Sequence, residues 1–158
     1  DTQEQTVETP IPLNGFIQIA LVVEDMDRAL DAWCELLNTP RPHVRVTPAE
    51  PDPDESYRGE TASYGLKFAV IECPERGFAI ELHEPDENPS TFREFLREHG
   101  NGVHHIGFQV GAARDAVVAE LGDLGYPVRN IGHYPGGSWT VVDSEADLGV
   151  NLNIKPVA

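Results

Sequence analysis

The sequence predicts an α+β fold in which two tandem βαβββ modules form a curved mixed sheet around a cleft. One reason is the order of hydrophobic patterns, which runs strand, helix, strands and then, after a linking helix, strand, helix, strands again. A second reason is an internal match between the two halves of the chain at a fixed shift. A third is that apolar strands in both halves carry isolated polar residues at matching places. Together these features predict a duplicated unit whose polar residues share a cleft.

The chain begins with a polar, proline-bearing stretch, residues 1–13, which is typical of a flexible N-terminal arm. Residues 15–23, GFIQIALVV, are rich in apolar and β-branched side chains and predict a largely buried strand. Residues 24–38 carry apolar side chains at helical spacing, with Asp25 as the candidate N-cap. These two elements are expected to open the first module.

The segment at 39–63 contains five prolines and several acidic residues, so it is predicted to be mostly irregular, with a short strand at 43–46. A loop of this length often helps to form or cover a site. Residues 64–73 and 78–85 predict two strands joined by a turn, and 90–100 predicts the linking helix.

The second half repeats this order. Its expected elements are a strand at 103–110, a helix at 113–125, a strand running into a turn at 127–136, and closing strands at 137–144 and 150–156. We therefore expect a first module with its linking helix at 14–100 and a second module at 101–158.

An internal repeat supports the duplication. A shift of 87 residues lays QIALVV, which begins at Gln18, over HIGFQV, which begins at His105. A second match lays IEL over LNI and pairs Glu81 with Asn153. Gln18 and His105 are therefore expected at equivalent places, and so are Glu81 and Asn153.

These four residues are polar members of otherwise apolar strands. Taken singly, such residues are more often hydrogen-bonded or solvated side chains than functional ones. Because the duplication relates their positions, we expect Gln18, Glu81, His105 and Asn153 to converge in the cleft. Successive side chains of a strand point to opposite faces, so His104 and His105 are predicted to separate, with only His105 facing the cleft.

The remaining histidines and the cysteines are weaker candidates. His83 shares the predicted face of Glu81, and His43 and His133 lie in loop-like segments that can reach the cleft. Neither Cys34 nor Cys73 has the neighbours that a zinc site requires.

Charge and composition exclude several classes of partner. The 158-residue chain has a net charge of −16, with 27 acidic and 11 basic residues, which disfavours nucleic acid and anionic membranes. No apolar run reaches the roughly 18 residues of a membrane span. Two unpaired cysteines fit a reducing compartment, so a cytoplasmic protein with a small-molecule ligand is expected.

Four segments resemble the vicinal oxygen chelate superfamily, which includes glyoxalase I, bleomycin-resistance proteins, extradiol dioxygenases and methylmalonyl-CoA epimerase. They are IQIALVVEDMDRALDAW, AIELHEP, STFREFLREHGNGVHHIGFQV and DLGVNLNI, and the epimerase branch is the most similar. The resemblance runs from Phe16 to Ile154 and implies a glyoxalase-like fold. It also implies a homodimer, because members of the family pair their modules within or between chains.

The resemblance further implies a metal site with four ligands. Glu81 and His105 match the family pattern, whereas Gln18 stands where the first-strand His is typical and Asn153 where the last-strand Glu is typical. If a divalent metal binds, these four residues are its expected ligands. Two neutral amides are poor ligands for a hard cation, so no cofactor is the first expectation and a divalent metal is the alternative.

The catalytic glutamate that the epimerases carry on their third strand is also absent. Phe68 takes its place, although an alignment shift brings Lys67 there instead. The expected activity is that of a racemase or epimerase that removes and returns a proton α to a carbonyl without a metal. His105 and Glu81 are the expected acid–base residues.

The expected substrate-binding residues are of two kinds. The amides of Gln18 and Asn153 would hydrogen-bond the substrate carbonyl, and Phe68, Tyr134 and Trp139 would favour a flat aromatic ligand. The resemblance is compatible with dihydrodaidzein racemase, so an aromatic ketone such as the isoflavanone dihydrodaidzein is the expected substrate. The alternatives are a metal-dependent enzyme similar to methylmalonyl-CoA epimerase and a non-catalytic binder similar to bleomycin-resistance proteins.

Overall fold

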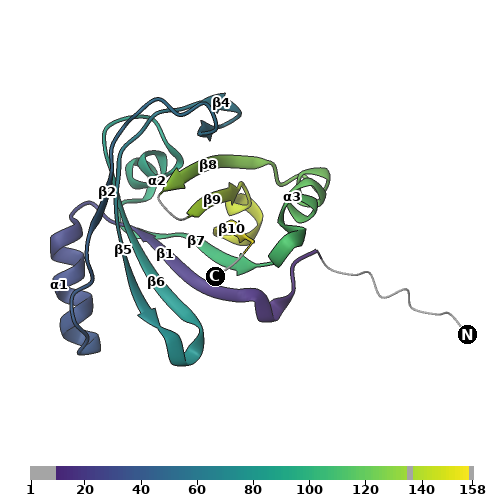
Figure 1. Cartoon of the computed structure of the whole chain (residues 1–158). Helices are drawn as coiled ribbons and strands as arrows, with labels where there is room; N and C mark the ends of the chain where they lie inside the picture. The colour runs from purple at the N-terminus through teal and green to yellow at the C-terminus, as the bar shows by residue number, and fades with distance from the viewer. Residues whose placement is uncertain (1–9, 135–136, 157–158) are drawn as a thin grey trace, which may run out of the picture.

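The computed structural model describes residues 10–134 and 137–156, so residues 1–9 of the predicted arm and 135–136 of a predicted turn lie outside it. A single sheet of ten strands curls around the middle of the molecule (Figure 1). Its order is β2-β5-β6-β1-β7-β10-β9-β8-β3-β4. This arrangement confirms the predicted α+β fold with a curved mixed sheet.

The elements follow the predicted order closely. The strands are β1 (Phe16–Val22), β2 (Arg45–Thr47), β3 (Ser56–Tyr57), β4 (Glu60–Thr61), β5 (Leu66–Cys73), β6 (Phe78–Pro85), β7 (Gly102–Gln109), β8 (Val128–Tyr134), β9 (Gly137–Val142) and β10 (Asn151–Lys155). The α-helices are α1 (Met26–Leu37), α2 (Thr91–His99), α3 (Arg114–Asp123) and α4 (Glu145–Leu148). Short 3₁₀ turns lie at Leu13–Gly15, Pro74–Arg76 and Gly111–Ala113.

The two halves of the sheet have the same internal order, and they meet along the antiparallel pair β1–β7. Ile19 lies opposite Ile106, the same pair that the internal repeat relates by its shift. β6 runs parallel to β1, and β10 runs parallel to β7 in the same way. The sheet therefore has an approximate twofold relation between its halves, while the module boundaries at 14–100 and 101–158 stay a prediction.

Helices cover the outer face of each half. α1 begins at the predicted N-cap, where the Asp25 side chain accepts a hydrogen bond from Arg28 N (3.1 Å). Its buried Met26 and Leu30 pack on Leu82 and neighbouring apolar residues. α3 packs in the same manner on β10, so each helix lies over its own half of the sheet.

The prediction for residues 39–63 was incomplete. β2 pairs with β5 at one edge of the sheet, but the same segment then forms the hairpin β3–β4, which extends the other edge by pairing with β8. Arg58 and Gly59 both have positive φ, as a two-residue hairpin turn requires. Strands of two residues carry no hydrophobic period, which is why the sequence pattern missed them.

α2 closes one end of the curled sheet. Phe92 and Phe95 of this helix are buried against Tyr64, Trp139 and other apolar side chains of both halves. The side chain of Ser90 accepts a hydrogen bond from Arg93 N (3.0 Å) and caps the helix. This packing gives the space inside the sheet a floor of aromatic side chains.

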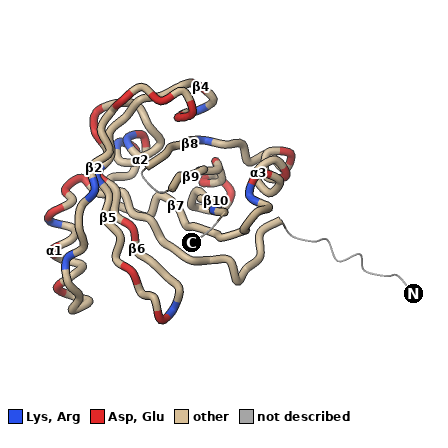
Figure 2. The backbone as a smooth tube through the Cα atoms, viewed as in Figure 1, with Lys and Arg blue, Asp and Glu red and all other residues tan. Residues whose placement is uncertain are grey.

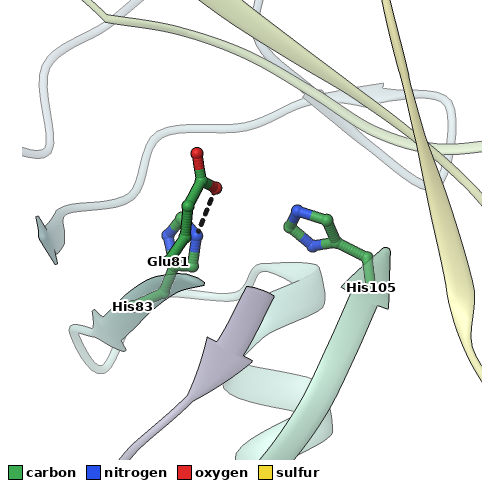
Figure 3. Close-up of side chains that lie close together, drawn as sticks. All are labelled: Glu81, His83 and His105. Carbon is green, nitrogen blue, oxygen red and sulfur yellow. Dashed lines mark hydrogen bonds and ion pairs between the residues drawn. The ribbon is translucent and has the colours of Figure 1, made fainter. Parts of the chain in front are cut away.

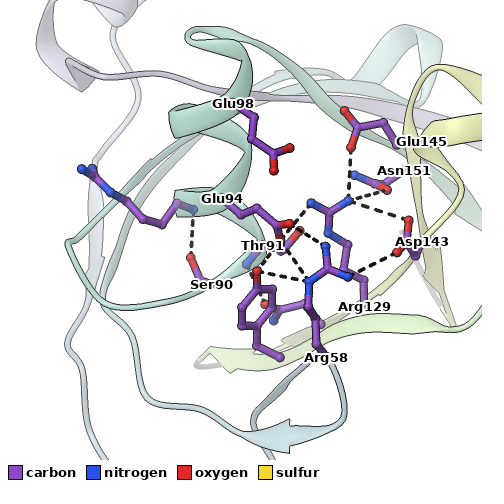
Figure 4. A network of polar contacts seen from close by, with 12 residues as sticks. Arg58, Ser90, Thr91, Glu94, Glu98, Arg129, Asp143, Glu145 and Asn151 are labelled. Carbon is purple, nitrogen blue, oxygen red and sulfur yellow. Dashed lines mark hydrogen bonds and ion pairs between the residues drawn. The ribbon is translucent and has the colours of Figure 1, made fainter.

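A buried arginine fastens α2 to the second half (Figure 4). Arg129 is only 3% exposed and forms ion pairs with Glu94 of α2 (3.2 Å), Glu145 (3.2 Å) and Asp143 (3.8 Å). Arg58 pairs with the same Glu94 (2.6 Å), so the β3–β4 hairpin joins the network. Elements that meet only in the folded chain are thereby held around the closed end of the sheet.

Acidic residues lie along α1, around the β3–β4 hairpin and at the β5–β6 turn (Figure 2). This distribution agrees with the excess of acidic over basic residues in the sequence. In the part of the chain that the structure describes, no helix has both the length and the apolar character needed to cross a bilayer.

Candidate functional site

A cavity of about 320 Å³ lies inside the curled sheet and is lined by side chains from both halves. All seven site residues that the sequence predicts line it: Gln18, Phe68, Glu81, His105, Tyr134, Trp139 and Asn153. Neither His43 nor His133 is among the lining residues. Instead, His43 is exposed and His133 pairs with Asp52 (3.6 Å).

Three ligand-type side chains meet on one wall of the cavity (Figure 3). Ligand atoms of Glu81, His83 and His105 all lie within 4.8 Å of one another. Glu81 and His83 project from the same face of β6, because they are two residues apart, and Glu81 Oε2 lies 3.3 Å from His83 Nε2. The sequence ranked His83 below the other candidates, although its shared face with Glu81 was the signal that could have raised it.

His105 stands across from this pair on β7. Its Nε2 is buried and has no hydrogen-bond partner among the described residues, whereas its Nδ1 lies 2.8 Å from Nδ1 of His104. An unpartnered polar atom inside a protein is uncommon and calls for a ligand or a proton-transfer role. His105 Nε2 and His83 Nδ1 are thus two buried nitrogens of the site that have no partner among the described residues.

The prediction that strand alternation separates His104 from His105 was wrong. Ala20 pairs with His105 but the next residue, Leu21, pairs with Val103, so His104 is the extra residue of a β-bulge. A bulge locally breaks the alternation and re-aims side chains. The two imidazole rings are therefore in contact, although only His105 lines the cavity, as expected.

The environment fixes the charge of both groups. Burial by itself would raise the pKa of Glu81, but the hydrogen bond from His83 and the positive charge of Lys155 lower it to about 2. Burial and the neighbouring His104 lower the pKa of His105 well below its ordinary value of 6.5. At neutral pH the site thus presents an ionised carboxylate and a neutral imidazole.

A lysine that the sequence reading missed lies opposite the triad. Lys155 is 9% exposed, and its Nζ donates to Oε1 of Gln18 (3.1 Å). The Nε2 of Gln18 donates in turn to Glu81 Oε2 (3.2 Å), so one amide bridges the ammonium and the carboxylate. Alternation from Asn153 was the available signal, because Lys155 is two residues further along β10.

The amide of Asn153 is partly committed to the protein, since its Oδ1 accepts a hydrogen bond from Thr140 N (3.1 Å). Gln18 owes its position to Gly107, which lies opposite it on β7. A Cβ at Gly107 would collide with the Gln18 side chain. Glycine therefore lets the amide lie flat across the strand between the two charged groups.

Aromatic rings form the remaining wall. Tyr134 stacks on Trp139 with centroids 5.6 Å apart and also meets the edge of Phe68 at 5.3 Å. The guanidinium of Arg45 lies over the Phe68 ring at 5.6 Å. Phe92 of α2 lines the closed end. Such a wall accepts flat apolar groups and keeps water away from the polar wall opposite.

The comparisons with known proteins agree with this architecture. The family model of the Glyoxalase/Bleomycin resistance protein/Dioxygenase superfamily matches residues 17–142. The chain belongs to this superfamily. A search of curated protein sequences found no significant match.

Solved structures of low sequence identity share the superfamily fold. The methylmalonyl-CoA epimerase from Mycobacterium tuberculosis is 19% identical with a TM-score of 0.62, over 98% of this chain and 95% of that one. A hypothetical protein from Bacillus halodurans is 21% identical with a TM-score of 0.58, over 88% and 91% of the two chains. A mutant 4-hydroxymandelate synthase from Streptomyces coelicolor is 17% identical with a TM-score of 0.56, over 92% of this chain and 48% of that one.

Within the superfamily fold, the arrangement can do two things chemically. Glu81, His83 and His105 offer a carboxylate and two imidazoles, which can hold a divalent cation. The neutral His105 Nε2 and the ammonium of Lys155 can alternatively act as a base and as an electrostatic partner for a developing oxyanion.

Proposed function

We propose that the protein is an isomerase that removes a proton next to a carbonyl group and returns it on either face, with a divalent metal ion held by Glu81, His83 and His105. The observation that carries this proposal is the convergence of these three side chains, with the unpartnered His105 Nε2, on one wall of the cavity. Methylmalonyl-CoA epimerases share the fold, and epimerisation is the class of reaction that we propose.

The donor set fits such an ion. Two imidazoles and one carboxylate are frequent ligands of zinc, iron, cobalt and manganese in proteins. Metal ligands must be deprotonated, and the site meets this condition because the pKa of Glu81 is lowered to about 2 and His105 is neutral. A bound ion would act as a Lewis acid that polarises the substrate carbonyl.

The other residues of the cavity would hold the substrate in place. Lys155 uses one N–H on Gln18, and an ammonium has three, so the others can bind a substrate oxygen. Phe68, Tyr134 and Trp139 would exclude water from the reacting carbon, which strengthens every electrostatic interaction there. Gln18 and Asn153 remain predicted substrate-binding residues at the junction between the two walls.

A metal-independent form of the same reaction is the second candidate, and the buried ammonium of Lys155 is the observation that favours it. In this form His105 Nε2 accepts the proton, the ionised Glu81 stabilises the imidazolium that results, and this imidazolium returns the proton to the same carbon once the other face of the enolate has turned toward it. Lys155 holds the enolate oxygen. The acid–base role that the sequence predicts for His105 is kept, whereas Glu81 supports it electrostatically in place of transferring a proton itself.

We propose a small aromatic ketone as the substrate, because the aromatic wall is continuous from Phe68 to Trp139. The volume of about 320 Å³ lies near the lower end of small-molecule sites, so an isoflavanone such as dihydrodaidzein is a suitable probe. The acyl end of a CoA ester is the second probe, since methylmalonyl-CoA epimerases share the fold.

The test incubates one enantiomer of dihydrodaidzein, and separately one epimer of methylmalonyl-CoA, with the protein in deuterated water. Each reaction is run after EDTA dialysis and again after Co²⁺ is added back. Inversion with deuterium incorporation that EDTA abolishes and Co²⁺ restores supports the proposal. Inversion that survives EDTA supports the metal-independent form. Tight binding without exchange would show a non-catalytic binder and overturn both.

A matched pair of histidine variants separates the site from the rest of the chain. His105→Gln is expected to abolish exchange and Co²⁺ binding, because it removes the free Nε2. His43→Gln changes an exposed histidine outside the cavity and is expected to keep both. The predicted homodimer is a separate proposal that sedimentation velocity tests, and the cytoplasmic location stays a prediction.

A further inference from the structure

A buried chain of hydrogen bonds runs behind the cavity from α2 to His105. Thr91 Oγ1 lies 2.9 Å from His104 Nε2, and His104 Nδ1 lies 2.8 Å from His105 Nδ1. Thr91 and His104 are each 0% exposed and His105 is 1% exposed. These hydrogen bonds therefore connect the hydroxyl of Thr91 through the His104 imidazole to His105, whose other nitrogen, Nε2, faces the cavity without a partner.

The protons in this chain are countable. Both rings are almost fully buried, and burial disfavours the doubly protonated, charged imidazolium, so each ring carries one proton. The bond between the two Nδ1 atoms contains one proton, because two N–H groups would repel and two lone pairs would not bond. Either His105 holds that proton and its Nε2 is bare, or His104 holds it and His105 Nε2 carries an N–H.

We propose that Thr91 and His104 are positioning residues that keep the proton of His105 on Nδ1, so that its Nε2 lone pair points into the cavity. In this arrangement His104 Nε2–H donates to Thr91 Oγ1 and His105 Nδ1–H donates to His104 Nδ1. The opposite arrangement leaves a buried N–H of His105 without an acceptor among the described residues, and orphaned buried N–H groups are rare. The inference rests on the proposed function, which uses this lone pair.

The fold holds His104 in the required orientation. The β-bulge turns its ring toward His105, and Asn151 Nδ2 donates to its backbone carbonyl (3.3 Å). Phe92 and Phe95 of α2 pack against the ring at centroid distances of 4.9 and 5.4 Å. With apolar rings around it, the His104 imidazole hydrogen-bonds Thr91 on this side, through Oγ1 (2.9 Å) and through the Thr91 backbone.

The test reads the tautomer directly. Two-bond ¹H–¹⁵N NMR of the EDTA-treated protein at neutral pH distinguishes protonated from bare ring nitrogens, and the His105 signals are assigned by their loss in His105→Gln. The expected result is a protonated Nδ1 and a bare Nε2. A protonated Nε2 in the wild-type protein would overturn the inference without any variant.

Thr91→Val and Thr91→Ser form the matched pair. The valine removes the hydroxyl acceptor for His104 Nε2–H at nearly constant volume and leaves the Thr91 backbone in place, so part of the proton population is expected to move to His104 Nδ1, at the cost of the His105 lone pair. Co²⁺ affinity, followed by visible absorption, should fall about 10- to 100-fold, as for other residues that orient metal ligands. Thr91→Ser should keep the tautomer and the affinity.

An unchanged tautomer and affinity in Thr91→Val would also refute the role of the hydroxyl. Failure of the proposed function gives a different result. If the wild-type protein shows the expected tautomer but binds no Co²⁺, the positioning role of Thr91 and His104 stands and the proposed metal site is refuted. If the protein binds Co²⁺ but His105 Nε2 is protonated when the metal is absent, the proposed metal site stands and the positioning role is refuted.

Discussion

The buried, neutral imidazole of His105 should make the protein lose stability in mild acid, and His105→Gln should reduce that loss. The pKa of His105 is depressed in the folded state, first by burial and then by His104 and His83. The unfolded chain therefore takes up a proton near the ordinary value of 6.5 that the folded chain does not. Stability from this group is present above pH 6.5 and is lost as the pH falls below it.

The size of the effect follows from the ordinary pKa alone. For one histidine that stays neutral in the folded chain over this interval, lowering the pH from 7.5 to 5.5 costs at most about 1.4 kcal/mol of unfolding free energy, because only the unfolded chain takes up the proton. Glu81 contributes almost nothing in this interval, because it is ionised in the folded chain, where its pKa is about 2, and also in the unfolded chain, where its ordinary pKa is 4.5. Titrating groups that do not contact His105 behave alike in both proteins and cancel in the difference.

The assay is urea denaturation followed by tryptophan fluorescence at the two pH values, in EDTA so that metal binding does not add stability. The wild-type protein should lose up to about 1.4 kcal/mol more than His105→Gln over this interval. His43→Gln, a change at an exposed histidine, is the control and should lose as much as the wild type. Equal losses in the wild type and His105→Gln would refute the conclusion that His105 is neutral in the folded state.

Three further outcomes are expected. Phe92→Ala should lower the unfolding free energy by about 3–5 kcal/mol in urea denaturation, because Phe92 is 0% exposed and its loss opens the floor of the cavity. Arg129→Leu should cost about 1.5–3 kcal/mol by the same measurement, because it removes charge-assisted hydrogen bonds to the partly buried Glu94 and Glu145, which keep Arg58 and His99 as partners, whereas Arg41→Leu at an exposed ion pair should cost about 1 kcal/mol or less. Lys155→Met should raise the pKa of Glu81 from about 2, measured by ¹³C NMR titration of its carboxyl group.

Most of the site residues that line the cavity can be predicted from the sequence, because two regularities combine: the alternation of side chains along each strand and the internal repeat. Alternation along each strand selects the inward face, and the repeat shift selects which strands are equivalent. The shift relates Gln18 to His105, and the structure places them on β1 and β7, the two strands that meet at the centre of the sheet. The aromatic candidates Tyr134 and Trp139 also line the cavity.

What the sequence did not show depends on irregularities and long-range contacts. The bulge at His104 has no local signature, because an extra residue is defined only by the partner strand, here at Ala20 and Leu21. The pairing of β3 with β8 joins segments far apart in the chain. Phe92 was read as part of a linking helix, and only the folded chain brings it under the cavity.

The duplication also explains why the cavity has two unlike polar walls. The shift that lays Glu81 over Asn153 lays His83 over Lys155, and Gln18 lies over His105, so the approximate twofold relates one triad to the other. The triad of Glu81, His83 and His105 corresponds to Asn153, Lys155 and Gln18. The first triad offers side chains that can hold a cation, whereas the second contains a cation that is part of the chain, the ammonium of Lys155. The Gln18 amide hydrogen-bonds Lys155 through its oxygen and Glu81 through its nitrogen, so a single amide group separates the two polar walls. In the proposed function, a substrate oxygen between the walls would meet the permanent positive charge of Lys155 on one side and a bound metal ion on the other. Substitution of Lys155 and removal of the metal with EDTA therefore test the two charges independently in the same reaction.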